Sequence, residues 1–274
     1  EFKEGDQCPT AVVPAYDSRA TLARTLDALL GDNGERVKRV VVVASGEGAS
    51  RVRDFERPRV EVVVSCRRLS AGLARNLGAQ IVFGRNPEED LVLFVDADCA
   101  PAPGAVARMM ERLAEGGDAV SARLLRDGGG VVAWLRHALE FKEAEAGHAL
   151  WFVPSATLLC RRRAFEKAGG FPDMWPGEDL VFCHRLHRAG SRVAIAANAR
   201  SLHLHPRSWL ALFRHQFRLG ATSASARLQT GMPGSWFARR PLLSPLLFAG
   251  RAVRGLCWYA RRGLGEFLVF LLLF

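Results

Sequence analysis

The chain has 274 residues, of which 49% are hydrophobic, and it carries a formal net charge of +10. This length predicts one α/β domain of roughly 200–250 residues with an appendage, and the apolar content is sufficient for a sizeable core. The six cysteines are scattered without a Cys-x-x-Cys pair, which argues against a zinc ribbon or a disulfide framework and favours a reducing compartment.

The first half of the chain alternates short apolar runs with amphipathic segments. Runs typical of buried strands lie at residues 11–13, 40–43, 60–64 and 91–95, and helical spacing is found at residues 18–30, 73–83 and 105–114. Strands that alternate with helices predict a mostly parallel sheet flanked by helices, as in Rossmann-like α/β folds.

The second half is less regular. We expect strands at residues 118–125, 155–160, 192–195 and 200–203, helices at 131–147, 178–188 and 209–220, and a loop rich in Pro, Gly and Trp at 171–177. The composition changes after residue 230. We therefore predict a globular domain over residues 1–230 and a basic, hydrophobic, helical C-terminal tail over residues 231–274.

Asp96 and Asp98 follow directly after the apolar run at residues 91–95. The end of a buried parallel strand reaches the carboxyl edge of the sheet, where open α/β folds bind ligands. Two carboxylates at that edge can share a divalent cation and a ribose or diphosphate. On this motif alone, an equally good explanation is that both aspartates are solvated turn residues. Cys99 lies beside the pair without a base partner, and we interpret it as a packing residue.

Glu178 and Asp179 form a second acidic pair, in the first turn of a predicted helix and behind a loop that carries Trp175. The simpler explanation is that acids favour helix N-termini because of the helix dipole. The functional interpretation is a general base, because a hydroxyl becomes a better nucleophile when a carboxylate accepts its proton. The nearby tryptophan fits a surface on which a sugar stacks.

His203 and His205 lie two residues apart in a predicted strand and therefore share a face. One imidazole would complete a metal site begun by Asp98. Polar surface histidines at a strand end are the alternative.

The order of these motifs resembles family 2 glycosyltransferases of the GT-A fold, over roughly residues 10 to 230. The resemblance rests on residues 12–16, 73–79, 96–98, 161–171, 178–179, 203 and 216–220, each matching a family segment in the family's order. Each motif alone is weak evidence for the family, but the presence of these motifs in the family's order is specific evidence.

The resemblance implies an inverting, metal-dependent glycosyltransferase that moves a sugar from a nucleotide-diphosphate donor, by default a UDP-sugar, to a hydroxyl acceptor. It implies that Asp98 and His203 hold Mn²⁺ or Mg²⁺. It also implies two catalytic residues, Asp179 as the base and Glu178, which shapes the acceptor site. The implied acceptor residues are Trp175 and Gly177. The implied donor and nucleotide residues are Pro14, Tyr16, Ser45, Glu47, Arg75, Asn76, Asp96 and Arg218.

One segment departs from the family pattern. After the second predicted strand the family carries acidic residues that hold the base or ribose, whereas this chain has the sequence Ala44-Ser45-Gly46-Glu47. Glu47, Ser45 or backbone groups are the candidates to replace them. The identity of the nucleotide therefore stays open.

Two other functions are compatible with parts of this sequence. A non-catalytic, glycosyltransferase-like scaffold that binds a nucleotide sugar or a membrane partner is favoured slightly by the altered segment at residues 44–46. A phosphatase of the haloacid dehalogenase type also uses two aspartates after a strand. That class has a Thr or Val soon after them near the N-terminus, and here Cys99 and Ala100 follow at mid-chain.

The positive charge is concentrated toward the C-terminus. From Arg200 to Phe274 the chain has eleven arginines and one acid, Glu266, so this stretch carries the whole excess. Its Leu, Phe and Trp content predicts attachment to the cytoplasmic face of the cell membrane rather than to nucleic acid, which suits a lipid-linked or cell-envelope acceptor. Residues 267–274 are too few for a span, which needs about 20 residues. The start of a longer span and a helix packed on the domain are the alternatives.

Overall fold

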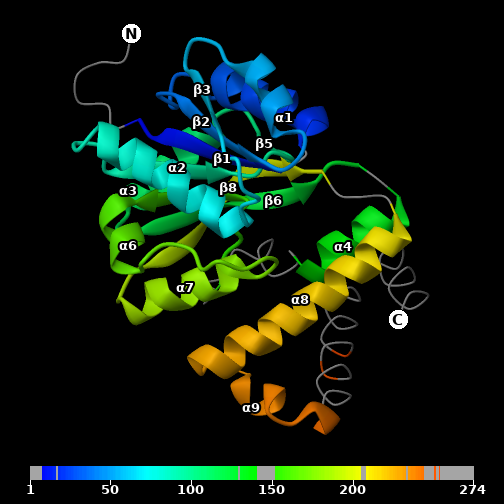
Figure 1. Cartoon of the computed structure of the whole chain (residues 1–274). Helices are drawn as coiled ribbons and strands as arrows, with labels where there is room; N and C mark the ends of the chain where they lie inside the picture. Colours follow the sequence, from blue (N-terminus) through cyan, green and yellow to red (C-terminus); the bar gives the residue numbers. More distant parts are fainter. Residues whose placement is uncertain are drawn as a thin grey trace. The chain divides into compact units, whose positions relative to one another are not determined.

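The computed structural model describes residues 8–16, 18–128, 130–140, 152–204, 208–232 and 234–243, together with Gly250 and Val253. The chain divides into two compact units, Glu1–Thr222 and Ser223–Phe274. The first unit contains an eight-stranded sheet (Figure 1). The domain boundary that the sequence suggests at residue 230 stays a prediction.

The strands and helices alternate along most of the chain. The strands are β1 (Thr10–Tyr16), β2 (Val40–Ser45), β3 (Val60–Val64), β4 (Leu91–Val95), β5 (Cys99–Pro101), β6 (Ala119–Arg126), β7 (Thr157–Arg161) and β8 (Val193–His203). The helices are α1 (Arg19–Asp27), α2 (Ala71–Arg85), α3 (Ala105–Ala114), α4 (Val131–Glu140), α6 (Arg162–Lys167), α7 (Glu178–Arg188), α8 (Trp209–Thr230) and α9 (Ser235–Ala238), with the shorter turns η1 (Ala28–Asp32), η2 (Ala49–Phe55) and η3 (Pro241–Leu243).

The strand order is β3-β2-β1-β4-β7-β6-β8-β5. The four strands β3, β2, β1 and β4 are parallel, which confirms the predicted βαβ arrangement of the first half. The other half is mixed, because β7 runs antiparallel to β4 and β6, and β5 runs antiparallel to β8.

Two element predictions in the second half need correction. The short strands expected at residues 192–195 and 200–203 are one strand, β8, which pairs with β6 on both sides of a register shift between Ala122 and Arg123. The helix expected to end at Gly220 continues to Thr230 as α8, since a single glycine is tolerated inside a long helix. Residues 141–147 of another predicted helix lie outside the described residues.

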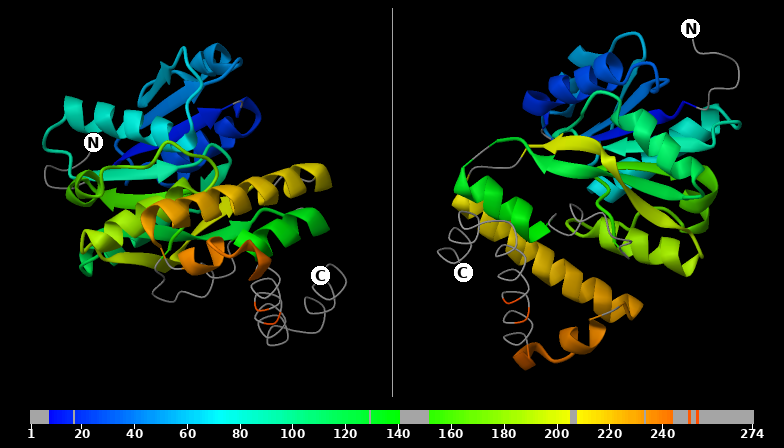
Figure 2. Two further views of the ribbon diagram at one scale, coloured as in Figure 1. Left: turned by 60° about the horizontal axis from the view of Figure 1, so that its bottom comes forward. Right: turned by 180° about the vertical axis from the view of Figure 1, so that it is seen from behind.

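The sheet is covered by helices on both faces (Figures 1 and 2). Helices α1 and α3 contribute Leu22 and Met109 to the apolar cluster on one face, and α7 contributes Phe182 to the cluster on the other. Strand β4 is buried on both faces, with Val95 in the first cluster and Phe94 in the second. Burial of each such side chain is worth about 1.5–3 kcal/mol, so the strand ends form a stable platform.

Two glycines let α2 approach its neighbours closely. A Cβ on Gly78 would lie 2.2 Å from Cγ1 of Val12 in β1, and a Cβ on Gly72 would lie 2.4 Å from the carbonyl oxygen of Pro172. Helix α2 is thus held between the sheet and the segment at residues 171–177, named loop 171–177 below. This position brings the middle of α2 next to the ends of the strands.

The predicted tail falls largely outside the described part of the chain, which ends at residue 243 apart from two isolated residues, so its helical form stays a prediction. Among the helices that are described, none combines the length and the hydropathy needed to cross a bilayer.

Candidate active site

Backbone pairing places Asp96 and Asp98 at the carboxyl edge of the sheet. Strand β4 ends at Val95, and the N–H of Asp96 then donates to the carbonyl oxygen of Ala156 (2.9 Å). The chain continues as β5, whose Cys99 pairs with His203 at the end of β8. The N–H of Leu204 also donates to the carbonyl oxygen of Asp98 (3.0 Å). These long-range bonds bring the second aspartate and the histidine together.

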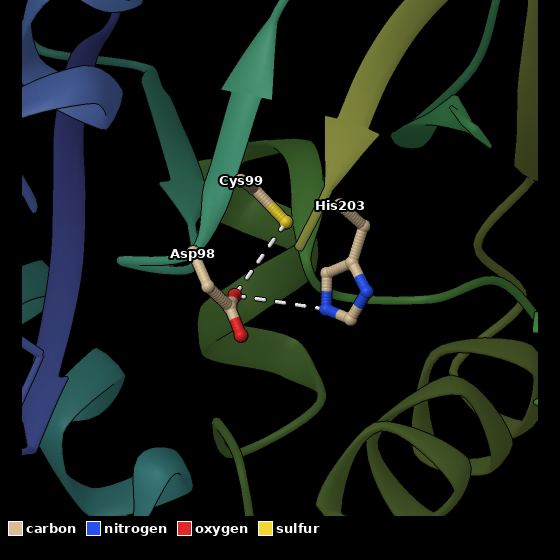
Figure 3. A group of neighbouring side chains, drawn as sticks. All are labelled: Asp98, Cys99 and His203. Atoms are coloured by element: carbon tan, nitrogen blue, oxygen red, sulfur yellow. Dashed lines mark hydrogen bonds and ion pairs between the residues drawn. The ribbon is translucent and has the colours of Figure 1, made fainter. Parts of the chain in front are cut away.

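The side chains of Asp98, Cys99 and His203 converge (Figure 3). Nε2 of His203 lies 3.6 Å from Oδ1 of Asp98, and Sγ of Cys99 lies 3.8 Å from the same oxygen. One ligand atom from each of the three residues lies within 4.8 Å of the others. The imidazole is buried, whereas the side chain of Asp98 is 42% exposed. One carboxylate and one imidazole form a donor set that suits a divalent cation such as Mn²⁺.

Cys99 is fully buried in the apolar cluster on one face of the sheet, as the packing interpretation expects, and its thiol also lies against Asp98. Burial raises the pKa of its thiol well above the ordinary value, and the charge of Asp98 raises this pKa further. The residue is therefore a neutral thiol against the carboxylate at neutral pH. Its only signal in the sequence is its position next to Asp98.

Arg75 of α2 joins the two acidic motifs. Its Nη2 donates to Oδ1 of Asp96 (2.5 Å) and its Nη1 donates to Oε1 of Glu178 (2.8 Å). The arginine side chain is 2% exposed and that of Glu178 is 8% exposed. The guanidinium carbon lies 5.2 Å from the ring centroid of Phe171. Burial by itself lowers the pKa of Arg75, but the charges of the two acids outweigh it and raise the pKa above its usual value.

The roles that the family resemblance implies for Arg75 and Glu178 stay predictions, and the structure shows where both side chains lie. Arg75 was predicted to bind the donor, yet its guanidinium lies inside the protein between two carboxylates. Glu178 was predicted to assist catalysis, yet it takes the buried position opposite Arg75. Both side chains are therefore placed to position the motifs that carry Asp96 and Asp179.

Asn76 fixes the start of loop 171–177. Its Nδ2 donates to the carbonyl oxygen of Phe171 (2.8 Å), and its Oδ1 accepts from the N–H of the same residue (2.9 Å). The neighbouring Gly170 has a φ of +68°, and a Cβ there would lie 2.7 Å from the Asn76 Oδ1. Asn76 was predicted to bind the donor, and the structure directs its amide to this loop instead.

Asp179 is half-buried in the first turn of α7. The helix starts after Gly177, whose φ of +102° lies in the left-handed region that favours glycine. Oδ1 of Asp179 accepts from the N–H of Leu180 (2.9 Å). Burial, followed by the charge of Glu178, raises the pKa of Asp179 to about 7. A carboxylate with such a pKa is suited to take a proton near neutral pH.

Trp175 lies at the other end of this loop and is 47% exposed. Its ring meets that of His215 edge-on, with centroids 5.9 Å apart, and the guanidinium carbon of Arg218 lies 5.9 Å from the Trp175 centroid. Both partners come from α8. Arg218 was predicted to bind the donor, and the structure places it beside the residue predicted to bind the acceptor.

Tyr16 and Ser45 are neighbours at the ends of β1 and β2, where they pair in register. The tyrosine ring is 43% exposed and has the guanidinium carbon of Arg68 4.7 Å from its centroid. Ser45 is buried, and its hydroxyl accepts from the N–H of Leu69 (3.3 Å). Arg68 was not predicted as a site residue. Its signal in the sequence is a pair of arginines just after the third strand.

The remaining predicted residues are distributed around this edge. Pro14 is half-buried within β1, which extends past it, and Glu47 is exposed on the turn after β2. His205, the second histidine of its motif, lies outside the described residues. The predicted site residues thus gather in three groups, around Asp98, around Asp179 and around Tyr16.

The fold matches that of solved GT-A glycosyltransferases. The mannosyltransferase PcManGT from Pyrobaculum calidifontis in complex with GDP-Man and Mn²⁺ superimposes with a TM-score of 0.60 and 20% identity, over 94% of this chain and 76% of that chain. GalNAc-T7 with UDP, GalNAc and Mn²⁺ superimposes with a TM-score of 0.58 and 15% identity, over 74% of this chain and 45% of that chain. These likenesses establish the class of fold.

Sequence comparison then gives the family. Residues 8–222 match the model of the glycosyltransferase like family 2, and the chain belongs to this family. It is 30% identical over 219 residues to the pre-mycofactocin glycosyltransferase of Mycobacterium tuberculosis, covering 74% of this chain and 44% of the relative. It is 32% identical over 152 residues to the succinoglycan biosynthesis protein ExoO of Rhizobium meliloti, covering 54% of this chain and 40% of the relative. The chain spans less than half the length of these curated relatives.

Proposed function

We propose that this protein is an inverting glycosyltransferase that moves a sugar from a nucleotide-diphosphate donor to a hydroxyl acceptor. The observation that carries the proposal is that the motif with the convergent Asp98–His203 pair and the motif with Asp179, whose pKa is raised to about 7, are bound to the same arginine. Arg75 connects the two parts through Asp96 and Glu178. Membership of the glycosyltransferase like family 2 supports the same reaction.

On the donor side, Asp98 and His203 would hold Mn²⁺ or Mg²⁺, which supplies positive charge for the departing diphosphate. The donor is a UDP-sugar by default. The exposed ring of Tyr16 offers a surface for the base, and Arg68 beside it offers a cation. The solved relatives with GDP-Man and Mn²⁺, or with UDP and Mn²⁺, support a metal-dependent nucleotide-sugar donor.

On the acceptor side, Asp179 accepts the hydroxyl proton while the acceptor oxygen bonds to the anomeric carbon. The diphosphate oxygen leaves on the opposite side with the electrons of the broken bond, so that the configuration inverts. Trp175 and the side-chain-free Gly177 shape the space for the acceptor. Glu178 positions the turn through Arg75 and takes no proton.

The acceptor is proposed only by class, as a hydroxyl on a lipid-linked or cell-envelope molecule at the cytoplasmic face of the membrane. The basic, apolar composition of residues 231–274 supports this location. The curated relatives are named for pre-mycofactocin and for succinoglycan biosynthesis, so their names point to different acceptors.

Thermal unfolding with Mn²⁺ and a panel of UDP-, GDP- and dTDP-sugars tests the donor site. A ligand at about 100 times its dissociation constant adds about 2.7 kcal/mol of stability, and we expect this stabilisation with one nucleotide class only when metal is present. Asp98→Ala should abolish it. Asp27→Ala, at the far end of α1 with its side chain 72% exposed, should leave it unchanged.

The outcomes separate the alternatives. If no nucleotide sugar gave a metal-dependent rise in the melting temperature, the donor assignment would be overturned. A shift without release of nucleoside diphosphate in the presence of hydroxyl acceptors would favour the non-catalytic scaffold instead.

A further inference from the structure

The N-terminal half of α8 exposes a set of large apolar side chains. Trp209, Leu210, Phe213 and Phe217 are 44%, 57%, 65% and 81% exposed. With 3.6 residues per turn, these four lie within an arc of about 100° around the helix axis. We name them the α8 apolar face. Leu212 lies outside this arc and is 2% exposed.

The candidate active site does not account for this face. His215 and Arg218, which contact Trp175, lie on another side of the helix. Within the described residues of the first unit, the other exposed large apolar side chains are Tyr16 and Trp175, both at the candidate site. Contiguous exposed apolar patches on soluble proteins commonly mark interaction surfaces.

The charge around the α8 apolar face favours an anionic partner. From Leu180 to Gly265 the chain has no acidic residue, and Arg214 on α8 is exposed beside the apolar arc. In a symmetric contact with a second copy, Arg214 of each copy would lie in the same interface, and neither α8 has an acid to pair with it. An anionic lipid surface matches both features, because its phosphates attract the arginines and its acyl boundary accepts the aromatic rings.

We propose that the α8 apolar face docks the protein on an anionic phospholipid bilayer, with the helix lying in the plane of the interface. Phe213 and Phe217 insert below the headgroups, and Arg214 contacts lipid phosphate. Trp175 lies against the neighbouring side of the same helix, so docking would bring the proposed acceptor site close to the bilayer. The proposal is independent of glycosyl transfer, because lipid binding is measured without a donor.

Flotation of the full chain with phospholipid vesicles tests this proposal. We expect binding to vesicles that contain phosphatidylglycerol, weaker binding at high salt, and little binding to phosphatidylcholine alone. Phe213→Gln with Phe217→Gln should reduce the partition coefficient at least about tenfold, since two exposed rings leave the interface. Arg214→Gln should reduce it about fivefold and only on anionic vesicles.

The matched control is Phe213→Leu with Phe217→Leu, which keeps an apolar side chain at both positions and should bind nearly as wild type. Unchanged melting temperatures would show that the variants fold. If the variant with Phe213→Gln and Phe217→Gln floated with the vesicles as well as the wild type does, the proposal would be overturned and membrane binding would belong to another segment. A dimer in solution that the double Gln variant abolishes, without vesicle binding, would overturn it in favour of a second copy.

Discussion

The two aspartates that follow β4 are both half-buried but have different partners. Asp96 is bonded to a buried arginine and through it to Glu178, and we name these three residues the closed network. Asp98, two residues further on, has a carboxylate that is 42% exposed and directed to His203, and we name these two residues the open pair. One motif therefore contains a positioning acid and a candidate ligand. Spacing in the sequence does not make two acids equivalent.

The two groups should respond differently to mutation. In the closed network, loss of one partner leaves a buried charge without compensation, which is costly for folding. In the open pair, burial raises the pKa of Asp98, so loss of its carboxylate removes a charge that burial disfavours and should change ligand binding more than stability.

The largest expected effect is on turnover in Asp179→Asn. We expect kcat to fall by about 10²–10⁴, the usual contribution of a positioned general base. Stability should not fall, because the substitution removes a carboxylate whose ionised form is disfavoured by burial and by Glu178. Release of nucleoside diphosphate and thermal unfolding measure the two quantities.

Asp173→Asn is the matched control for this variant, since Asp173 is an exposed acid on the same loop that accepts from Ser70 Oγ (2.8 Å). It should keep near-wild-type turnover. Retention of more than a tenth of the activity by Asp179→Asn would remove Asp179 from the proposed mechanism.

The next effect is on folding in Arg75→Met. This change leaves Asp96 and Glu178 without their shared cation, so the free energy of unfolding should fall by about 3–5 kcal/mol. Arg75→Met with Glu178→Leu should recover part of the loss, because it removes one of the two stranded charges. Urea unfolding measures each variant.

Asp98→Ala provides the contrast from the open pair and should change the free energy of unfolding by only about 0.5 kcal/mol. Equal losses in Arg75→Met and Asp98→Ala would erase the distinction between the two groups. If Arg75→Met had the same free energy of unfolding as the wild type, the closed network would be dispensable for folding.

The smallest effect is on the pH profile. Asp179 must be ionised to accept a proton, and its pKa is raised to about 7, so kcat/KM should fall about tenfold for each pH unit below that value. Glu178→Gln removes a neighbouring negative charge that raises this pKa. The acid limb of the profile should therefore move to lower pH in that variant, and an unchanged limb would contradict the electrostatic coupling of the two acids.

Local patterns predicted several elements with their observed bounds. The strand over residues 91–95 was predictable because its apolar run is buried on both faces, and α7 was predictable because acids begin it and Gly190 follows its end. Strand β8 was divided in two because the bulge opposite Ala122 interrupts its pattern. The antiparallel order of β7 and β5 left no local signal, since strand direction depends on how the chain returns to the sheet.

The sequence by itself determined most of the strands and helices, that carboxylates and a histidine follow strand ends, and which family these motifs resemble. Only the tertiary structure decided that Asp98 meets His203, because this contact depends on the pairing of β5 with β8. It also decided that Arg75 and Asn76 face inward, to Glu178 and Phe171. A residue type fixes the bonds a side chain can make, but burial and register select its partner, and both are set by parts of the chain far away in sequence.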